Sequence, residues 1–133
     1  MKLLKIVFLF ALGLGVFTSC KKDKDPVTVP SSQFSGKYEG KYGTGNNTPI
    51  VFFSFNIKQN GTLEELDETG QIIGTGIWTL DGNIFEASSH YVSPATNVFA
   101  LIASYDASSK KLAGTWGYGD NDKDGGKWNM TKK

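Results

Sequence analysis

The sequence predicts an all-β fold, an eight-stranded antiparallel up-and-down barrel, and three observations support this prediction. From Phe34 onward, apolar and polar residues alternate with a period of two in short segments, as in half-buried strands. Short turn sequences such as Asn60-Gly61 separate the segments and favour hairpins. Neither a helical period nor the long connections of a two-sheet sandwich follow Phe34, so closure into a barrel is the favoured arrangement.

Each expected strand has its own signal. Residues 34–42 place Phe34, Tyr38 and Tyr42 on one face. Aromatic and β-branched residues mark 50–58, and a weaker alternation marks 63–68. The other five strands are expected over residues 72–80, 84–92, 97–105, 111–118 and 127–132. Glycines inside these strands predict sharp bends or close approach of neighbours, as in a small, strongly curved barrel: Gly36, Gly40, Gly74, Gly76, Gly114 and Gly117.

The N-terminal residues indicate export followed by lipid attachment. Lys2 and Lys5 accompany an apolar run of twelve residues, a pattern typical of a secretory signal peptide and too short for a membrane span. The single cysteine, Cys20, ends the segment "FTSC", which resembles the lipobox of bacterial lipoproteins. The resemblance implies cleavage before Cys20 and acyl chains on it. Ordinary cleavage would instead leave a free thiol, which is a liability in an oxidising compartment.

The predicted organisation is a signal peptide over residues 1–19, a lipid-modified Cys20 with a flexible linker over 20–33, and a barrel domain over 34–133. We expect an envelope protein anchored in the bacterial outer membrane, on its periplasmic face or at the cell surface. Loss of Lys2 and Lys5 with the signal peptide changes the formal net charge from +1 to −1, and the chain has no arginine. A nucleic-acid partner is not expected, because phosphate binding requires a basic face.

Five segments carry a resemblance to a known family: "GKYEGKY", "FSFNIKQNGTL", "GTGIWTLDGNIF", "LAGTWGY" and "GGKWNMTK". Together they resemble the small lipocalin-like lipoproteins that are common in the Bacteroidota. The resemblance covers most of residues 34–133 and implies a barrel on a lipid anchor, but no assigned activity. The chain departs from typical lipocalins at Gly36-Lys37-Tyr38, where those proteins carry Gly-x-Trp.

Large rings on the predicted inner face are the candidate ligand-binding residues: Tyr38, Trp78, Trp116, Tyr118 and Trp128. They either line a small cavity, where hydroxyl and indole N–H groups orient a ligand, or simply fill the barrel. The first interpretation predicts a non-enzymatic protein that binds a small apolar or amphiphilic ligand in or at the mouth of the barrel. The second predicts a protein-interaction module, an accessory subunit or enzyme inhibitor, that acts through its rim loops. We expect a monomer in either case.

Candidate catalytic residues are few. His90 is the only histidine and has no cysteine nearby, so a zinc site is not predicted, and no nucleophile-elbow pattern surrounds a serine. Glu64, Glu65, Asp67 and Glu68 are interpreted as a solvated acidic edge, whereas acid–base chemistry needs a buried carboxyl with a raised pKa. We therefore expect no enzymatic activity.

The segment "GDNDKDGGKW" over residues 119–128 contains the first half of a calcium loop. Three aspartates stand at alternate positions before Gly125-Gly126: Asp120, Asp122 and Asp124. Thr131 occupies the position where such a loop needs a bidentate glutamate. The segment is either a weak calcium site or, as we favour, the polar hairpin loop that precedes the last strand. No other cofactor is expected.

Overall fold

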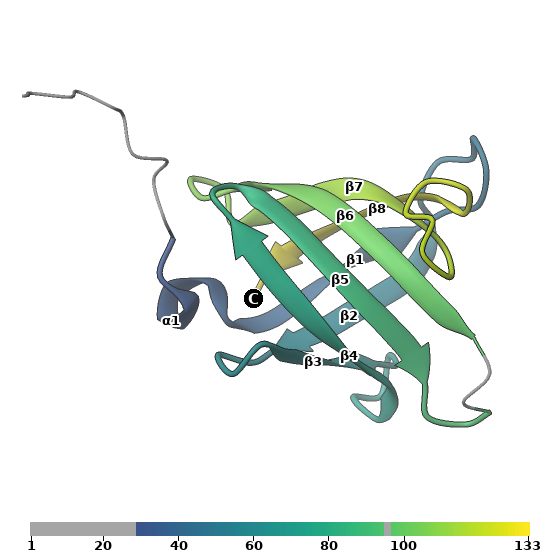
Figure 1. The fold of residues 1–133 in the computed structure, drawn as a ribbon, viewed down its shortest axis with the longest axis horizontal. Coiled ribbons are helices and arrows are strands. Elements are labelled where there is room, and N and C mark those ends of the chain that lie inside the picture. Colours follow the sequence, from purple (N-terminus) through teal and green to yellow (C-terminus); the bar gives the residue numbers. More distant parts are fainter. Residues whose placement is uncertain (1–28, 95–96) are drawn as a thin grey trace, which may run out of the picture.

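The computed structural model describes residues 29–94 and 97–133. Eight antiparallel strands follow one another around a closed barrel, and β8 returns to pair with β1 (Figure 1). The strands are β1 (Gly36–Tyr42), β2 (Val51–Ile57), β3 (Thr62–Leu66), β4 (Ile72–Asp81), β5 (Ile84–Tyr91), β6 (Val98–Asp106), β7 (Lys111–Tyr118) and β8 (Gly126–Lys132). The predicted all-β barrel is confirmed. The predicted signal peptide, Cys20 and the first part of the linker lie outside the described residues.

The strands lie within two residues of where the alternating pattern places them, because turn chemistry separates them at the expected points. The first strand begins at Gly36 and not at Phe34 as predicted. Gly61 and Gly82 follow Asn60 and Asp81 in two hairpins, with φ of 84° and 60°. These positive values are the backbone conformation that tight hairpin turns require and that glycine adopts without strain.

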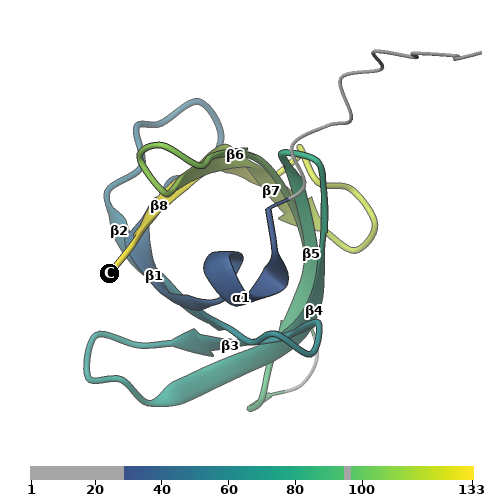
Figure 2. The ribbon, with the colours of Figure 1, turned by 90° about the vertical axis from the view of Figure 1, so that its left-hand side faces the viewer.

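One end of the barrel is closed by a short helix that the sequence pattern did not predict. Residues Ser31–Phe34 form α1, and Figure 2 shows this helix within the ring of strands. Phe34 is fully buried, with its ring centre 4.8 Å from that of Tyr105 and 5.1 Å from that of Trp78. The Tyr38 hydroxyl donates a 2.6 Å hydrogen bond to the Phe34 carbonyl, which satisfies that buried oxygen. The end of the predicted linker is therefore part of the folded domain.

Within the described part of the chain, no helix is long and apolar enough to cross a bilayer.

Several strand glycines mark places where neighbouring strands are in very close contact. A Cβ atom built on Gly114 would lie 1.9 Å from the Ile102 carbonyl oxygen, and one on Gly40 would lie 1.8 Å from that of Asn129. No real side chain tolerates such distances, so both positions require glycine. The predicted close approach in a strongly curved barrel is confirmed at these positions.

Gly114→Ala is expected to lower the free energy of unfolding by at least about 2 kcal/mol, because the methyl group would push two strands apart. Urea unfolding followed by tryptophan fluorescence would measure the change. Ala113→Ser is the control, since Ala113 is the exposed neighbour on β7 and its change should stay within about 0.5 kcal/mol. Equal stabilities of the two variants would show that the barrel relaxes at Gly114.

Candidate functional site

Three of the five predicted ligand-binding residues belong to the filled half of the barrel. Tyr38, Trp78 and Trp128 are buried among other core rings and lie outside the cavity described below. Trp128, for example, packs edge to face against Phe85 with 6.0 Å between ring centres. In this half, the interpretation that rings fill the interior is correct.

The indole N–H groups do not have the ligand-orienting role that the cavity interpretation would give them. Trp78 donates to the Lys58 carbonyl at 2.8 Å, and Trp116 donates to the Gly43 carbonyl at 2.9 Å. Trp128 likewise donates to a backbone carbonyl. Each indole therefore ties its strand to a neighbouring segment, and its only donor is already used.

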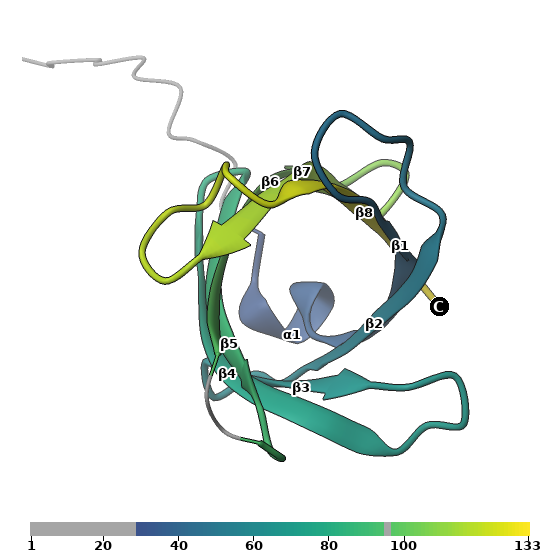
Figure 3. The same ribbon diagram turned by 90° about the vertical axis from the view of Figure 1, so that its right-hand side faces the viewer.

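The opposite end of the barrel holds an open cavity of about 240 Å³. Figure 3 looks into this end, with α1 visible at the far side of the barrel. The apolar lining residues are Phe53, Phe55, Phe99, Leu101 and Trp116. The polar lining residues are Tyr42, Thr44, Glu65, Ser89, Tyr91, Asn97 and Tyr118. Trp116 and Tyr118 are thus the two predicted ligand-binding residues that line it.

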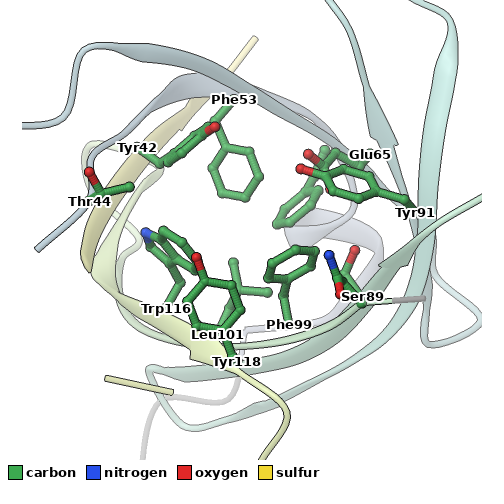
Figure 4. A pocket seen from close by; sticks show the side chains of 12 residues that line it. Tyr42, Thr44, Phe53, Glu65, Ser89, Tyr91, Phe99, Leu101, Trp116 and Tyr118 are labelled. Carbon is green, nitrogen blue, oxygen red and sulfur yellow. The ribbon is translucent and has the colours of Figure 1, made fainter. Parts of the chain in front are cut away.

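Strand register brings Glu65 and Tyr91 to one wall of this cavity. Glu65 on β3 pairs with Gly74 on β4, and Gly74 in turn pairs with Tyr91 on β5. Gly74 has no side chain, so the two flanking side chains share the space above it. A Cβ atom there would lie only 3.2 Å from Glu65 Oε2. Figure 4 shows Glu65 and Tyr91 side by side, across the cavity from Trp116.

Glu65 is buried, which corrects its interpretation as part of a solvated acidic edge. The residue is 8% exposed, and burial raises the pKa of its carboxyl to about 7. Among the described residues, no cation and no hydrogen-bond donor meets its carboxyl. Its neighbour Glu64 is the solvated carboxylate, because Lys58 and Asn56 bind it on the outside of the barrel and lower its pKa. The alternation with the buried Leu63 indicates that Glu65 points inward. The prediction of a solvated side chain instead followed from the charge of glutamate.

Ser89 contributes a second unpartnered polar group. It is 1% exposed, and its hydroxyl has no hydrogen-bond partner among the residues that the structure describes. A buried hydroxyl without a partner destabilises a protein by roughly 1–3 kcal/mol. Glu65 and Ser89 are therefore two buried polar groups in the lining of one cavity, and a ligand can satisfy both.

His90 and Ser89 lie on opposite sides of the barrel wall. Successive residues of a strand point to opposite faces, so Ser89 points inward while His90 is exposed on the outside. His90 Nε2 lies 3.5 Å from Thr75 Oγ1 on that outer surface. The two neighbours cannot act together as nucleophile and base.

The aspartate loop is a hydrogen-bonded connection between β7 and β8. Asp124 Oδ1 accepts the Tyr118 N–H at 2.9 Å, and the Asp122 carbonyl accepts the Thr115 hydroxyl at 2.7 Å. Gly119, with φ of 62°, rather than Gly126, supplies the tight turn. Within residues 29–94 and 97–133, no three acidic, histidine or cysteine side chains gather into a group that could hold a metal ion.

We expect the melting temperature to be the same in calcium and in chelator, because Asp124 already binds the backbone and Asp120 and Asp122 form no ligand group with it. Differential scanning fluorimetry in both buffers would measure it. A calcium-dependent rise that disappears in Asp122→Asn with Asp124→Asn would instead establish the site.

Comparisons of this chain with protein-family models, with curated proteins and with solved structures found no match. The site therefore has to be interpreted from its own geometry. The closed, eight-stranded antiparallel barrel is consistent with a lipocalin-like fold, and lipid attachment and kinship with Bacteroidota lipoproteins stay predictions.

Proposed function

We propose that this protein binds a small apolar or amphiphilic molecule in the cavity at the open end of the barrel, without enzymatic turnover. The cavity supports the proposal, because ring-lined walls with a few buried polar groups are the usual composition of a ligand site. Its volume of about 240 Å³ suits a ligand the size of one ring with a short chain. Larger lipids exceed it.

We place the protein on a lipid anchor at Cys20 in the envelope of a bacterium. The described chain enters the barrel through α1 at the closed end (Figure 1), and the residues that line the cavity lie at the other end. Because α1 begins at Ser31, the tether after Cys20 shortens to residues 21–30, which span at most about 35 Å. With an anchor on the α1 side, the mouth can face the aqueous compartment. The ligand then arrives from solution and does not have to be extracted from the bilayer.

The three tryptophan indole N–H signals in an NMR spectrum give a direct test. We expect 2-phenylethanol and 2-phenylethylamine to shift the Trp116 signal, because Trp116 lines the cavity. The Trp78 and Trp128 signals should move far less, since both rings pack in the filled half. Binding on the outer surface would not produce this selectivity.

Ser89→Leu is the matching loss-of-function variant, because leucine would occupy part of the cavity and remove the unpartnered hydroxyl. We expect it to weaken probe binding by about tenfold or more while keeping the fold. Ser88→Leu is the control, since Ser88 is the next residue on β5 and faces outward. Absence of any Trp116 shift in the wild type, or equal binding by both variants, would refute the proposed function.

A protein partner at the rim is the second candidate, and one observation favours it. Exposed apolar side chains gather where strands begin or end at the open end: Ile50, Val51, Ile72, Val92 and Val98. Such a rim can contact an envelope protein. Binding of such a partner should be lost in the double variant Ile72→Lys with Val92→Lys and kept in Ser89→Leu. Binding of a small ligand in the cavity should be kept in the double variant and lost in Ser89→Leu.

A further inference from the structure

We infer that the ligand of this cavity carries a protonated amine, which binds to Glu65 and Ser89 while its apolar part lies against the cavity rings. This inference rests on the proposed function and specifies the chemical class of the ligand. It starts from two polar side chains that are more than nine-tenths buried, line the same cavity and have no protein partner among the described residues.

Charge determines which amphiphile fits. Among the described residues that line the cavity, Glu65 alone is charged. The chain has no arginine, and no lysine belongs to the lining, so a carboxylate or phosphate ligand would meet a like charge and no cation. An ammonium group meets a carboxylate that no protein cation has neutralised. Fatty acids and other anionic amphiphiles are thereby disfavoured.

The other groups near Glu65 are also suited to an ammonium ion. Ser89 Oγ can accept a hydrogen bond, and the Tyr91 hydroxyl lies on the same wall as Glu65 (Figure 4). The rings of Phe53, Phe99 and Trp116 surround the remaining space and can hold the apolar part of the ligand. Aromatic faces additionally attract cations, most strongly where water is excluded.

The surroundings of Glu65 make the binding pH-dependent. The strands paired with β3 place Phe55 and Gly74 next to it, neither of which titrates. The titratable groups that face the cavity from other strands are the phenols of Tyr42, Tyr91 and Tyr118. Burial, and after it the charge of Glu65, raises the pKa of Tyr91. Burial holds the pKa of Glu65 at about 7, so a fall in pH through this value removes the negative charge that attracts the amine.

Three matched probes test the inference: 2-phenylethylamine, the neutral 2-phenylethanol and the anionic 3-phenylpropionate. Calorimetric titration of the folded domain at pH 8 should show the amine binding at least about tenfold more tightly than the alcohol, because a hydrogen bond between charged groups is stronger than a neutral one. The anion should bind more weakly than the alcohol. The amine Kd should rise about five- to tenfold from pH 8 to pH 6, because the ionised fraction of Glu65 falls about tenfold while the neutral form still binds the amine weakly.

Glu65→Gln keeps the shape of the side chain and removes its charge. In this variant, the amine and the alcohol should bind within about threefold of each other, and the pH dependence should vanish. Equal binding of amine and alcohol by the wild type, or a preference that survives Glu65→Gln, would overturn the inference and leave the proposed function standing. Failure of all three probes to bind would remove the proposed function itself.

Discussion

Phe34→Ala is expected to lower the free energy of unfolding by about 3–5 kcal/mol, the range for removing a fully buried aromatic ring. Phe34 is 0% exposed and contacts the rings of Tyr38, Trp78, Phe85 and Tyr105 inside the closed end of the barrel. The strands around it are held by their backbone hydrogen bonds, so the neighbouring rings can fill only part of the space that Phe34 leaves. The result would be a cavity inside the filled half.

Chemical denaturation of the domain would measure this loss, with Ile77→Ala as the control. Ile77 lies on β4 and is 65% exposed, so its truncation should change the free energy of unfolding by less than about 0.5 kcal/mol. Equal effects of the two substitutions would mean that α1 is not a structural plug, and that the folded domain begins at β1.

The strand order was predictable because alternation and turn residues act locally. The expected burial of Phe34 is confirmed, but Phe34 belongs to α1 and not to the first strand as predicted. Its helical backbone was not predictable, since four residues are too few to show a helical period. The helix is stabilised by Phe34, its one apolar side chain, which packs against the hydrophobic residues at the closed end of the barrel.

The candidate site was predicted only in part. Tyr38, Trp116 and Trp128 all face inward, but the sequence does not indicate at which level of the barrel each ring lies. Only the register between strands shows that Trp128 meets Phe85 in the filled half while Trp116 reaches the cavity. Closure of the barrel, a long-range property, then brings residues of β1, β2, β3, β5, β6 and β7 around one space.

Glu65 shows how two valid signals can conflict. The alternation Leu63, Glu65 predicts an inward side chain, whereas a glutamate is almost never fully buried without a partner. The general tendency of glutamate to be exposed was the stronger expectation, and it gave the wrong prediction for Glu65. A buried glutamate without a partner lowers stability, so selection for stability alone would remove it. Its presence in a cavity is therefore a reason to expect a functional site there.

That conflict has a measurable consequence: Glu65→Gln is expected to become progressively more stable than the wild type as the pH rises. The pKa of Glu65 is raised from 4.5 to about 7 in the folded protein. Below about pH 4.5 the carboxyl is neutral in both states, so its burial adds no penalty. Between about pH 4.5 and pH 7 the unfolded chain loses this proton while the folded chain keeps it, so wild-type stability falls by a total of about 3 kcal/mol.

The measurement is the free energy of unfolding of Glu65→Gln and of the wild type at pH 4 and at pH 8. The stability advantage of the variant should be larger at pH 8 than at pH 4. Glu64→Gln is the matched control with the opposite sign. The Lys58 ammonium and the Asn56 amide lower the pKa of Glu64, so its contribution is present at high pH and is lost as the pH falls. If Glu65→Gln shows no pH-dependent gain, or follows Glu64→Gln, then the Glu65 carboxyl is solvated in the folded protein. The amine site would then lose the buried carboxylate on which it rests.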